Sequence, residues 1–226
     1  MIRSYLHSLV DPRGVIKWCL IALVFVPVLV LFSNLISRLL GRGTSFMLVF
    51  GTTGFPLIGL VTVKFLYQLF FYSATGEEAG WSGFARHRLQ THISPLLTAL
   101  IVCFFWALWH AFVWYAEGQH VLTVNYWIDT YINLLPSSII LTWLYNRGKG
   151  SILVVGIGHA AANTIFDTMA GIDSQVFTVI IYCAALTVIL IDKMWRKLPA
   201  EHPAVFQPVS EAIPLQEVFP KDKPSE

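Results

Sequence analysis

Three short polar clusters interrupt otherwise apolar stretches of this sequence, and their side chains are suited to acid–base chemistry. Carboxylates and imidazoles can move protons, and imidazole or carboxamide donors can stabilise a developing negative charge. Ionisable groups within a membrane are costly, so each is a functional hypothesis. Together the clusters could bring a carboxylate, two imidazoles and a carboxamide to one place. They are Glu77-Glu78, Trp106 with His110, and His159 with Asn163.

Helical spacing gives the side chains of each cluster a direction. Adjacent residues point about 100° apart on a helix, so Glu77 and Glu78 should face different neighbours and have different roles. Residues four apart share a face, which places Trp106 and His110 together. The pair at 159 and 163 is also four apart, and glycines and alanines around it would let a neighbouring helix approach closely. We therefore expect these faces in the interior of a helical bundle.

Composition defines the class of protein. The 226-residue chain is 56% hydrophobic and 12% charged, against about 25% charged in an average soluble domain. This excludes an ordinary soluble globule and predicts an all-α, polytopic membrane bundle of about six transmembrane helices. The six apolar runs are Trp18–Ser37, Pro56–Leu89, Ser94–Tyr115, Val121–Tyr145, Ser151–Asp167 and Val176–Met194.

The predicted organisation is one membrane domain between two polar ends. Residues 1–15 would form a cytoplasmic N-terminal segment, residues 16–197 the bundle, and residues 198–226 a proline-rich, disordered tail. Ten basic residues flank the spans on the side of both termini, whereas the opposite loops hold only Arg38 and Arg42. Because cytoplasmic loops are rich in Lys and Arg, we expect both termini in the cytoplasm. The predicted location is a bacterial plasma membrane.

Charge and cysteine content limit the partners. The net charge of +2 is too small and dispersed to form a track for nucleic acid. The three cysteines are scattered in apolar runs and have neither disulfide-framework nor metal-site spacing. The partners expected are therefore membrane lipid and a protein or peptide substrate, and not nucleic acid.

The three clusters lie at comparable depths in the predicted bundle. At about 1.5 Å per residue, Glu77 lies roughly 14 Å from Arg86, and His159 roughly 13 Å from Gly150, both measured from the cytoplasmic side. His110 lies deeper in its span. A lone buried histidine more often only packs, but carboxylate, imidazole and carboxamide groups at matching depth on three helices favour a shared site. We expect them in one cavity that opens to the cytoplasm.

In this order the clusters resemble the motifs of the CPBP family, which comprises CAAX prenyl endopeptidases and bacteriocin-processing enzymes also known as Abi proteins. Tryptophan replaces the phenylalanine of the second motif, and the resemblance covers residues 60–170 approximately. The motifs E-E-x-x-x-R, F-x-x-x-H and H-x-x-x-N correspond to Glu77-Glu78, Trp106 to His110, and His159 to Asn163.

The resemblance implies an intramembrane endopeptidase similar to type II CAAX prenyl proteases, which would hydrolyse a peptide bond of a membrane-associated protein or peptide, lipidated or not. Glu77 would be the general base that activates water, and His110 would orient that water. His159 and Asn163 would stabilise the tetrahedral oxyanion, with Trp106 in support. The resemblance implies no cofactor.

One position departs from the family motif, because Ser82 stands where the family has arginine. An arginine four residues after Glu78 could hold this supporting carboxylate in an ion pair, whereas serine offers one hydrogen bond. Arg86 follows on the same face, but its head would have to bridge about 12 Å along the axis. The substitution could therefore reduce activity, and we expect Ser82→Arg to leave activity equal or higher.

Three alternatives remain at this stage. The missing arginine motivates a non-catalytic immunity or scaffold protein of the same fold. Glu77, His110 and His159 also match the ligand count of a hydrolytic zinc centre, although the sequence contains no H-E-x-x-H motif. A haem held by two histidines is the third alternative.

Overall fold

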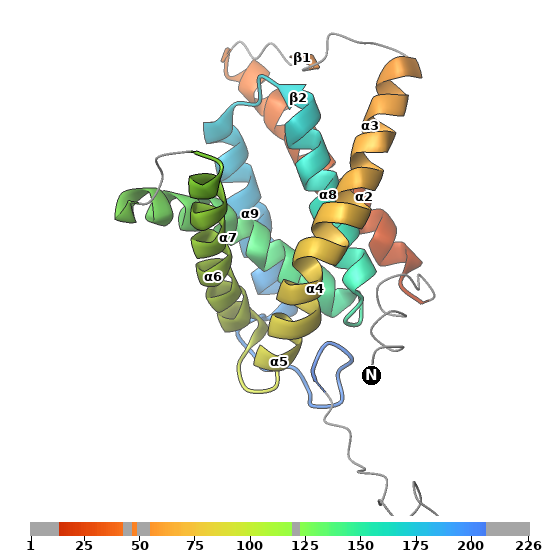
Figure 1. Cartoon of the computed structure of the whole chain (residues 1–226), viewed down its shortest axis with the longest axis vertical. Helices are drawn as coiled ribbons and strands as arrows, with labels where there is room; N and C mark the ends of the chain where they lie inside the picture. The colour runs from red at the N-terminus through yellow and green to blue at the C-terminus, as the bar shows by residue number, and fades with distance from the viewer. Residues whose placement is uncertain (1–13, 43–46, 49–54, 119–122, 207–226) are drawn as a thin grey trace, which may run out of the picture.

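The computed structural model of the protein describes residues 14–42, 47–48, 55–118 and 123–206. Most of the predicted N-terminal segment and residues 207–226 of the predicted tail lie outside this part. Within it, helical rods are packed side by side as a bundle (Figure 1), which confirms the predicted all-α fold. The rods are α2 (Ile16–Leu39), a compound second rod, α6 (Pro95–Ala116), α7 (Val124–Arg147), α8 (Ile152–Thr168) and α9 (Ser174–Asp192).

The second rod alternates between two kinds of helical winding. In its π-helical stretches the backbone N–H bonds to the carbonyl five residues earlier. The N–H of Glu78 thus donates to the carbonyl of Ser73, and that of His87 to the carbonyl of Ser82. These wide turns change which residues share a face. The segments are α3 (Phe55–Tyr67), η1 (Gln68–Glu77), α4 (Glu78–Gly80), η2 (Trp81–Arg86) and α5 (His87–Leu89), of which η1 and η2 are π-helical.

Side-chain caps begin four of the helices. Ser94, Thr123 and Ser151 each accept a hydrogen bond from the backbone N–H three residues later. Asp173 accepts from two N–H groups in the first turn of α9. Such caps satisfy donors that have no partner within the helix, and they explain why the helices begin close to the predicted positions.

The residues before α2 and after α9 lie at the same end of the bundle. A Cβ added to Gly14 would lie 4.0 Å from Lys149 Nζ, and one added to Gly150 would lie 2.7 Å from the carbonyl oxygen of Pro203. We call this the basic end, and the opposite end, where β1 (Met47–Leu48) pairs antiparallel with β2 (Met169–Ala170), the strand end (Figure 1). The basic end carries Lys17, Arg86, Arg88, Arg147, Lys149, Lys193, Arg196 and Lys197.

The segment after α9 packs against the basic end. Ala204 is fully buried, and its carbonyl accepts a hydrogen bond from Gln90 Nε2 at 3.2 Å. The N–H of Phe206 donates to the carbonyl of His87 at 3.0 Å. The sequence placed the start of a disordered tail at Leu198, whereas the structure continues the packed segment to Phe206. Its small and apolar residues explain the difference, because they fill space between the helix ends.

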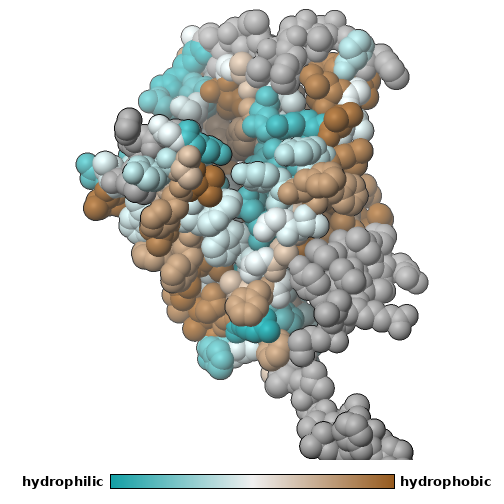
Figure 2. Space-filling view, viewed as in Figure 1, coloured by the Kyte–Doolittle hydropathy of each residue, from teal (hydrophilic) through white to brown (hydrophobic). Residues whose placement is uncertain are grey.

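Four rods are long and apolar enough to cross a membrane: Ile16–Leu39, Pro56–Leu89, Pro95–Ala116 and Ser174–Asp192. Of the two other predicted spans, α8 is apolar but has 17 residues, and α7 includes several polar residues. Large apolar side chains such as Phe71 and Val63 are exposed on the outer faces. Hydrophobic residues cover much of the surface in Figure 2. Such a surface suits lipid as its solvent.

Two glycines let the rods around α8 approach closely. A Cβ on Gly156 would lie 2.5 Å from the Cβ of Ala74 in η1, and one on Gly158 would lie 3.0 Å from Leu144 Cδ1 in α7. The small-residue face of α8 therefore lies in the bundle interior, as predicted. This contact sets the distance between η1, which carries Glu77, and α8, which carries His159.

We expect Gly156→Ala to lower the free energy of unfolding by about 1–3 kcal/mol, the usual cost of overpacking, because the added methyl group would collide with Ala74. Gly59→Ala is the matched control, since nothing lies within 4 Å of a Cβ at this helical position. Thermal unfolding of the purified protein in detergent measures both variants. Equal unfolding temperatures would contradict the close contact between η1 and α8.

Candidate active site

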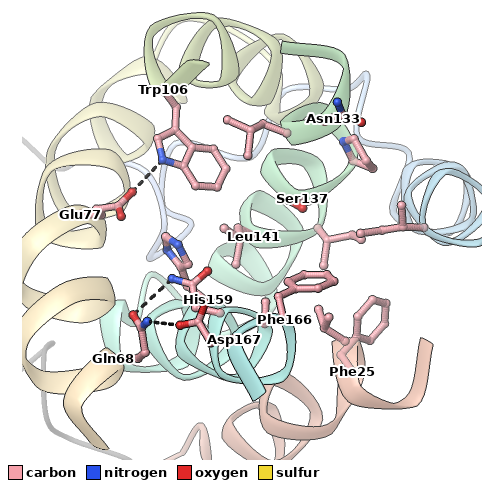
Figure 3. A pocket seen from close by; sticks show the side chains of 18 of the residues that line it. Phe25, Gln68, Glu77, Trp106, Asn133, Ser137, Leu141, His159, Phe166 and Asp167 are labelled. Carbon is pink, nitrogen blue, oxygen red and sulfur yellow. Dashed lines mark hydrogen bonds between the residues drawn. The ribbon is translucent and has the colours of Figure 1, made fainter. Parts of the chain in front are cut away.

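A cavity of about 750 Å³ lies among the rods and extends toward the strand end. Its walls come from α2, α3, η1, α6, α7, α8 and α9. The three polar clusters thus line one cavity, as their predicted depths indicated. Figure 3 shows Glu77, Trp106 and His159 around it. The cluster residues in the lining are Glu77, Trp106, His110, His159 and Asn163.

The mouth of the cavity lies toward the strand end. Lining residues on the side of the basic end, such as Ala22 and Leu144, are buried. Lys64, Asp167 and Ser174, at the other side, are partly or fully exposed. Figure 2 shows a hollow bordered by hydrophilic residues in this half. The sequence predicted a mouth on the same side as the termini. In the structure, buried side chains line the cavity toward the basic end, and the side of the membrane to which it opens stays a prediction.

The indole of Trp106 holds the carboxylate of Glu77 at the cavity wall. Glu77 is the last residue of η1 and is buried, and its Oε2 accepts a hydrogen bond from Trp106 Nε1 at 2.7 Å (Figure 3). The Trp106 ring also lies 5.4 Å, between centroids, from both His110 and His159. The tryptophan that replaces the motif phenylalanine therefore adds a donor to the site. The sequence analysis placed Trp106 among the supporting residues but did not predict this bond.

His110 presents one nitrogen as an acceptor. Its Nδ1 lies 3.0 Å from the carbonyl oxygen of Trp106, one turn earlier in α6. A carbonyl can only accept, so Nδ1 carries the proton in this contact and Nε2 of the neutral ring is left as an acceptor. The ring packs against Trp109 and Trp114 with centroid distances of 5.0 Å each. These contacts fix an imidazole that lines the cavity.

Glu78 faces a different neighbour from Glu77, as the sequence predicted for adjacent helical positions. Its Oε1 lies 3.0 Å from His159 Nδ1, and both side chains are buried. Because a carboxylate only accepts, Nδ1 of His159 carries a proton in this contact. Glu78 does not line the cavity. It therefore acts behind the site, by fixing the ring of His159.

A buried ion pair anchors Glu78 in turn. Its Oε2 lies 2.8 Å from Arg86 Nη1 and accepts a hydrogen bond from Ser82 Oγ at 2.5 Å. Arg86 Nη1 also donates to Ser82 Oγ at 2.7 Å, and Arg86 Nε donates to Thr142 Oγ1 of α7 at 3.0 Å. Arg86 is 1% exposed and Glu78 is 0% exposed. A charge pair this deeply buried is tolerated only with such additional hydrogen bonds.

Arg86 therefore takes the place of the arginine that the family motif has at position 82. The estimate from the sequence assumed a regular α-helix between Glu78 and Arg86 and found the separation too long. The π-helical winding of η2 packs more residues into each turn, and helical side chains lean toward the N-terminus. Ser82 lies fully buried between the two charges. The expectation for Ser82→Arg is thus reversed, because a second guanidinium has no room.

A chain of polar contacts that sequence reasoning missed orients Asn163. Gln68 Nε2 donates to Asp167 Oδ2 at 3.1 Å (Figure 3). Asn163 Nδ2 donates to Gln68 Oε1 at 3.4 Å, and Asp167 pairs with Lys64 at 2.9 Å. A carboxylate only accepts, so the Gln68 amide turns its NH₂ group toward Asp167. Its oxygen then faces Asn163 and accepts a hydrogen bond from the NH₂ group of that residue. The available signal was Gln68 itself, an amide within an apolar run.

The geometry bears on the alternative zinc site. Among the described residues, no group of three His, Cys, Asp or Glu side chains is placed to hold a metal ion. Glu77, His110 and His159 all line the cavity, but the indole of Trp106 lies among them. These three side chains therefore do not fit a shared tetrahedral ion.

The fold and the site define a helical, integral membrane protein with carboxylate, imidazole and carboxamide groups around one interior cavity. Residues 59–165 match the family described as type II CAAX prenyl endopeptidase, Rce1-like. The CAAX prenyl protease 2 of Methanococcus maripaludis is 29% identical over 180 residues, or 76% of this chain. The chain spans 65% of the length of that relative. Over these residues the chain is similar to the family that the motifs indicated.

We expect Arg86→Gln to lower the free energy of unfolding by about 3–5 kcal/mol, because it leaves the buried carboxylate of Glu78 without its cation. Arg88→Gln, at an exposed position two residues later, is the control and should cost about 1 kcal/mol or less. Ser82→Arg alone should also destabilise the protein, and Arg86→Ser added to it should recover most of the loss. Thermal unfolding in detergent checks all four proteins. If Arg86→Gln unfolds at the same temperature as Arg88→Gln, the ion pair is not a structural anchor.

Proposed function

We propose that the protein is an intramembrane endopeptidase that hydrolyses a peptide bond of a membrane-associated protein or peptide. The observation that carries the proposal is the position of Glu77, a buried carboxylate held by Trp106 at a cavity that His110, His159 and Asn163 also line. Similarity to a family described as endopeptidases supports it, as does the similarity to a relative named as a protease.

In this proposal Glu77 takes a proton from a water molecule that also donates a hydrogen bond to His110 Nε2. The water oxygen attacks the carbonyl carbon of the scissile peptide, and the carbonyl oxygen becomes an oxyanion. Asn163 and His159 donate hydrogen bonds to this oxygen, and His159 can do so from Nε2 when its ring carries both protons. Glu77 then passes the proton to the leaving nitrogen as the C–N bond breaks, which yields a carboxylic acid and an amine.

Glu78, Ser82 and Arg86 are positioning residues in this mechanism. They hold His159 from behind the cavity through the 3.0 Å contact of Glu78. Reduced activity was expected from the serine at the motif position, but Arg86 supplies the missing charge and removes this reason. It equally removes the motive for the non-catalytic immunity or scaffold alternative.

The apolar part of the cavity fits the membrane-embedded portion of a substrate. Aromatic and aliphatic side chains from α2, α7, α8 and α9 line it opposite the polar cluster, as Figure 3 shows for Phe25, Leu141 and Phe166. Binding of an apolar group in such a pocket is favourable, because it removes apolar surface from water. We therefore propose that an apolar segment, peptide or attached lipid, occupies this part while the scissile bond lies near Glu77.

We further propose that the basic end lies in the cytoplasm. The described residues place eight Lys and Arg there, and cytoplasmic flanks are rich in these residues. Both termini would then be cytoplasmic, as the sequence predicted, and the mouth with Lys64 and Asp167 would face the opposite side of the membrane. A substrate would present its cleaved segment from that side.

Substitutions in the cavity test the proposed activity. We expect Glu77→Gln to abolish cleavage of a membrane-protein substrate, because the amide cannot accept the proton from water. Asn163→Ala should lower kcat by about 10²–10³, the usual effect of removing one oxyanion donor. Peptidomics of membranes from a deletion strain complemented with each variant identifies the substrate, and purified protein then gives the rates. The control is Asn133→Ala, which changes an amide that lines the cavity but has no proposed role.

Retained turnover by a folded Glu77→Gln protein would exclude this mechanism. If the variant has no turnover but still confers the phenotype of the intact gene, the non-catalytic alternative is favoured. Glu77→Gln and Asn163→Ala must both be recovered in the membrane fraction, and thermal unfolding must show that both are folded.

Cysteine labelling tests the proposed orientation. Cys183 is the exposed native cysteine among the described residues, and Cys19 and Cys103 are buried. On a Cys183→Ala background, an impermeant maleimide should label Ser174→Cys in intact cells and Lys197→Cys only after permeabilisation. The reverse pattern would place the cavity mouth in the cytoplasm and overturn the proposed position of the termini.

A further inference from the structure

A second pocket, of about 480 Å³, lies at the basic end and shares no lining residue with the active-site cavity. Three rods surround it: α6 contributes its first residue, Pro95, and α7 and α9 contribute their last turns. The residues that follow α9 complete the wall. Because helix ends meet there, the pocket lies at the level where a membrane-spanning bundle leaves the apolar layer.

The lining of this pocket carries an excess of positive charge. Asp192 is its one carboxylate, and Arg147 already occupies both oxygens of Asp192 through Nε and Nη2. Lys193, Arg196 and Lys197 also line the pocket, and no carboxylate among the described residues pairs with them. Burial lowers the pKa of the remaining titratable group, His202, so its ring stays neutral at neutral pH. The pocket therefore has three cations to offer an anion.

Apolar surface continues from the pocket along the outside of α9. Ile191, which lines the pocket, is 67% exposed, and its neighbour Leu190 is 56% exposed. Trp195, three residues beyond the helix, is 49% exposed, and tryptophan is enriched at membrane interfaces. The ligand that fits these features has an anionic head and apolar chains.

We propose that this pocket binds the phosphate headgroup of an anionic phospholipid, whose acyl chains lie along the exposed face of α9. The phosphate oxygens contact Arg196 and Lys197, which both line the pocket. Basic pockets between transmembrane helices recognise lipid headgroups in this way. The proposal does not depend on the catalytic function.

Lipid titration of the full-length protein in detergent tests the proposal, with bound phospholipid counted by native mass spectrometry. The wild type should bind phosphatidylglycerol at least tenfold more tightly than phosphatidylcholine. Arg196→Gln combined with Lys197→Gln should reduce this binding about tenfold or more. The matched control is Lys17→Gln combined with Arg38→Gln, which removes two exposed charges outside the pocket and should leave binding within twofold.

Three results would overturn the proposal. Unchanged phosphatidylglycerol binding by the pocket variant would show that these cations are not the site. An equal loss in the control variant would show that only general surface charge attracts the lipid. Displacement of phosphatidylglycerol by inorganic phosphate or glycerol phosphate would assign the pocket to a soluble anion instead. Thermal unfolding of each variant separates loss of binding from loss of fold.

Discussion

The buried ion pair between Glu78 and Arg86 is the interaction on which the site depends. Removing two full charges from water is costly, and their attraction offsets this cost only when every remaining polar atom has a partner. Here the partners come from other rods. Arg86 Nε donates to Thr142, which itself donates to the carbonyl of Ser138 in α7, and Glu78 accepts from His159 in α8. One charge pair thus joins three rods and orients the imidazole at the cavity.

The winding of the second rod makes this pair possible. A π-helical turn is rare and often occurs at functional sites, because it places side chains that a regular helix would keep apart. In this protein η1 ends at Glu77 and η2 ends at Arg86, so the wide turns lie on both sides of Glu78. One carboxylate can then face Trp106 in α6 while its neighbour faces α8. The same change in winding therefore lets Glu77 and Glu78 contact different rods.

Local patterns in the sequence were sufficient for the helices and for much of the site. Apolar runs placed the rods closely, and four-residue spacing placed His159 with Asn163. The position of Arg86 was not predictable in this way, because i→i+4 geometry does not apply in η2. Gln68 was missed because its role appears only through Asp167, 99 residues away in the chain. The packed segment to Phe206 likewise depends on distant contacts.

The two ends of the active-site cavity differ in the burial of their polar groups. Toward the basic end, Arg86, Glu78 and Thr142 are all buried and satisfied, so water has no open path between them. Toward the strand end, Asp167 and Lys64 meet solvent. The solvent-exposed part of the cavity wall therefore lies toward the strand end. The network that positions His159 therefore also closes one end of the cavity.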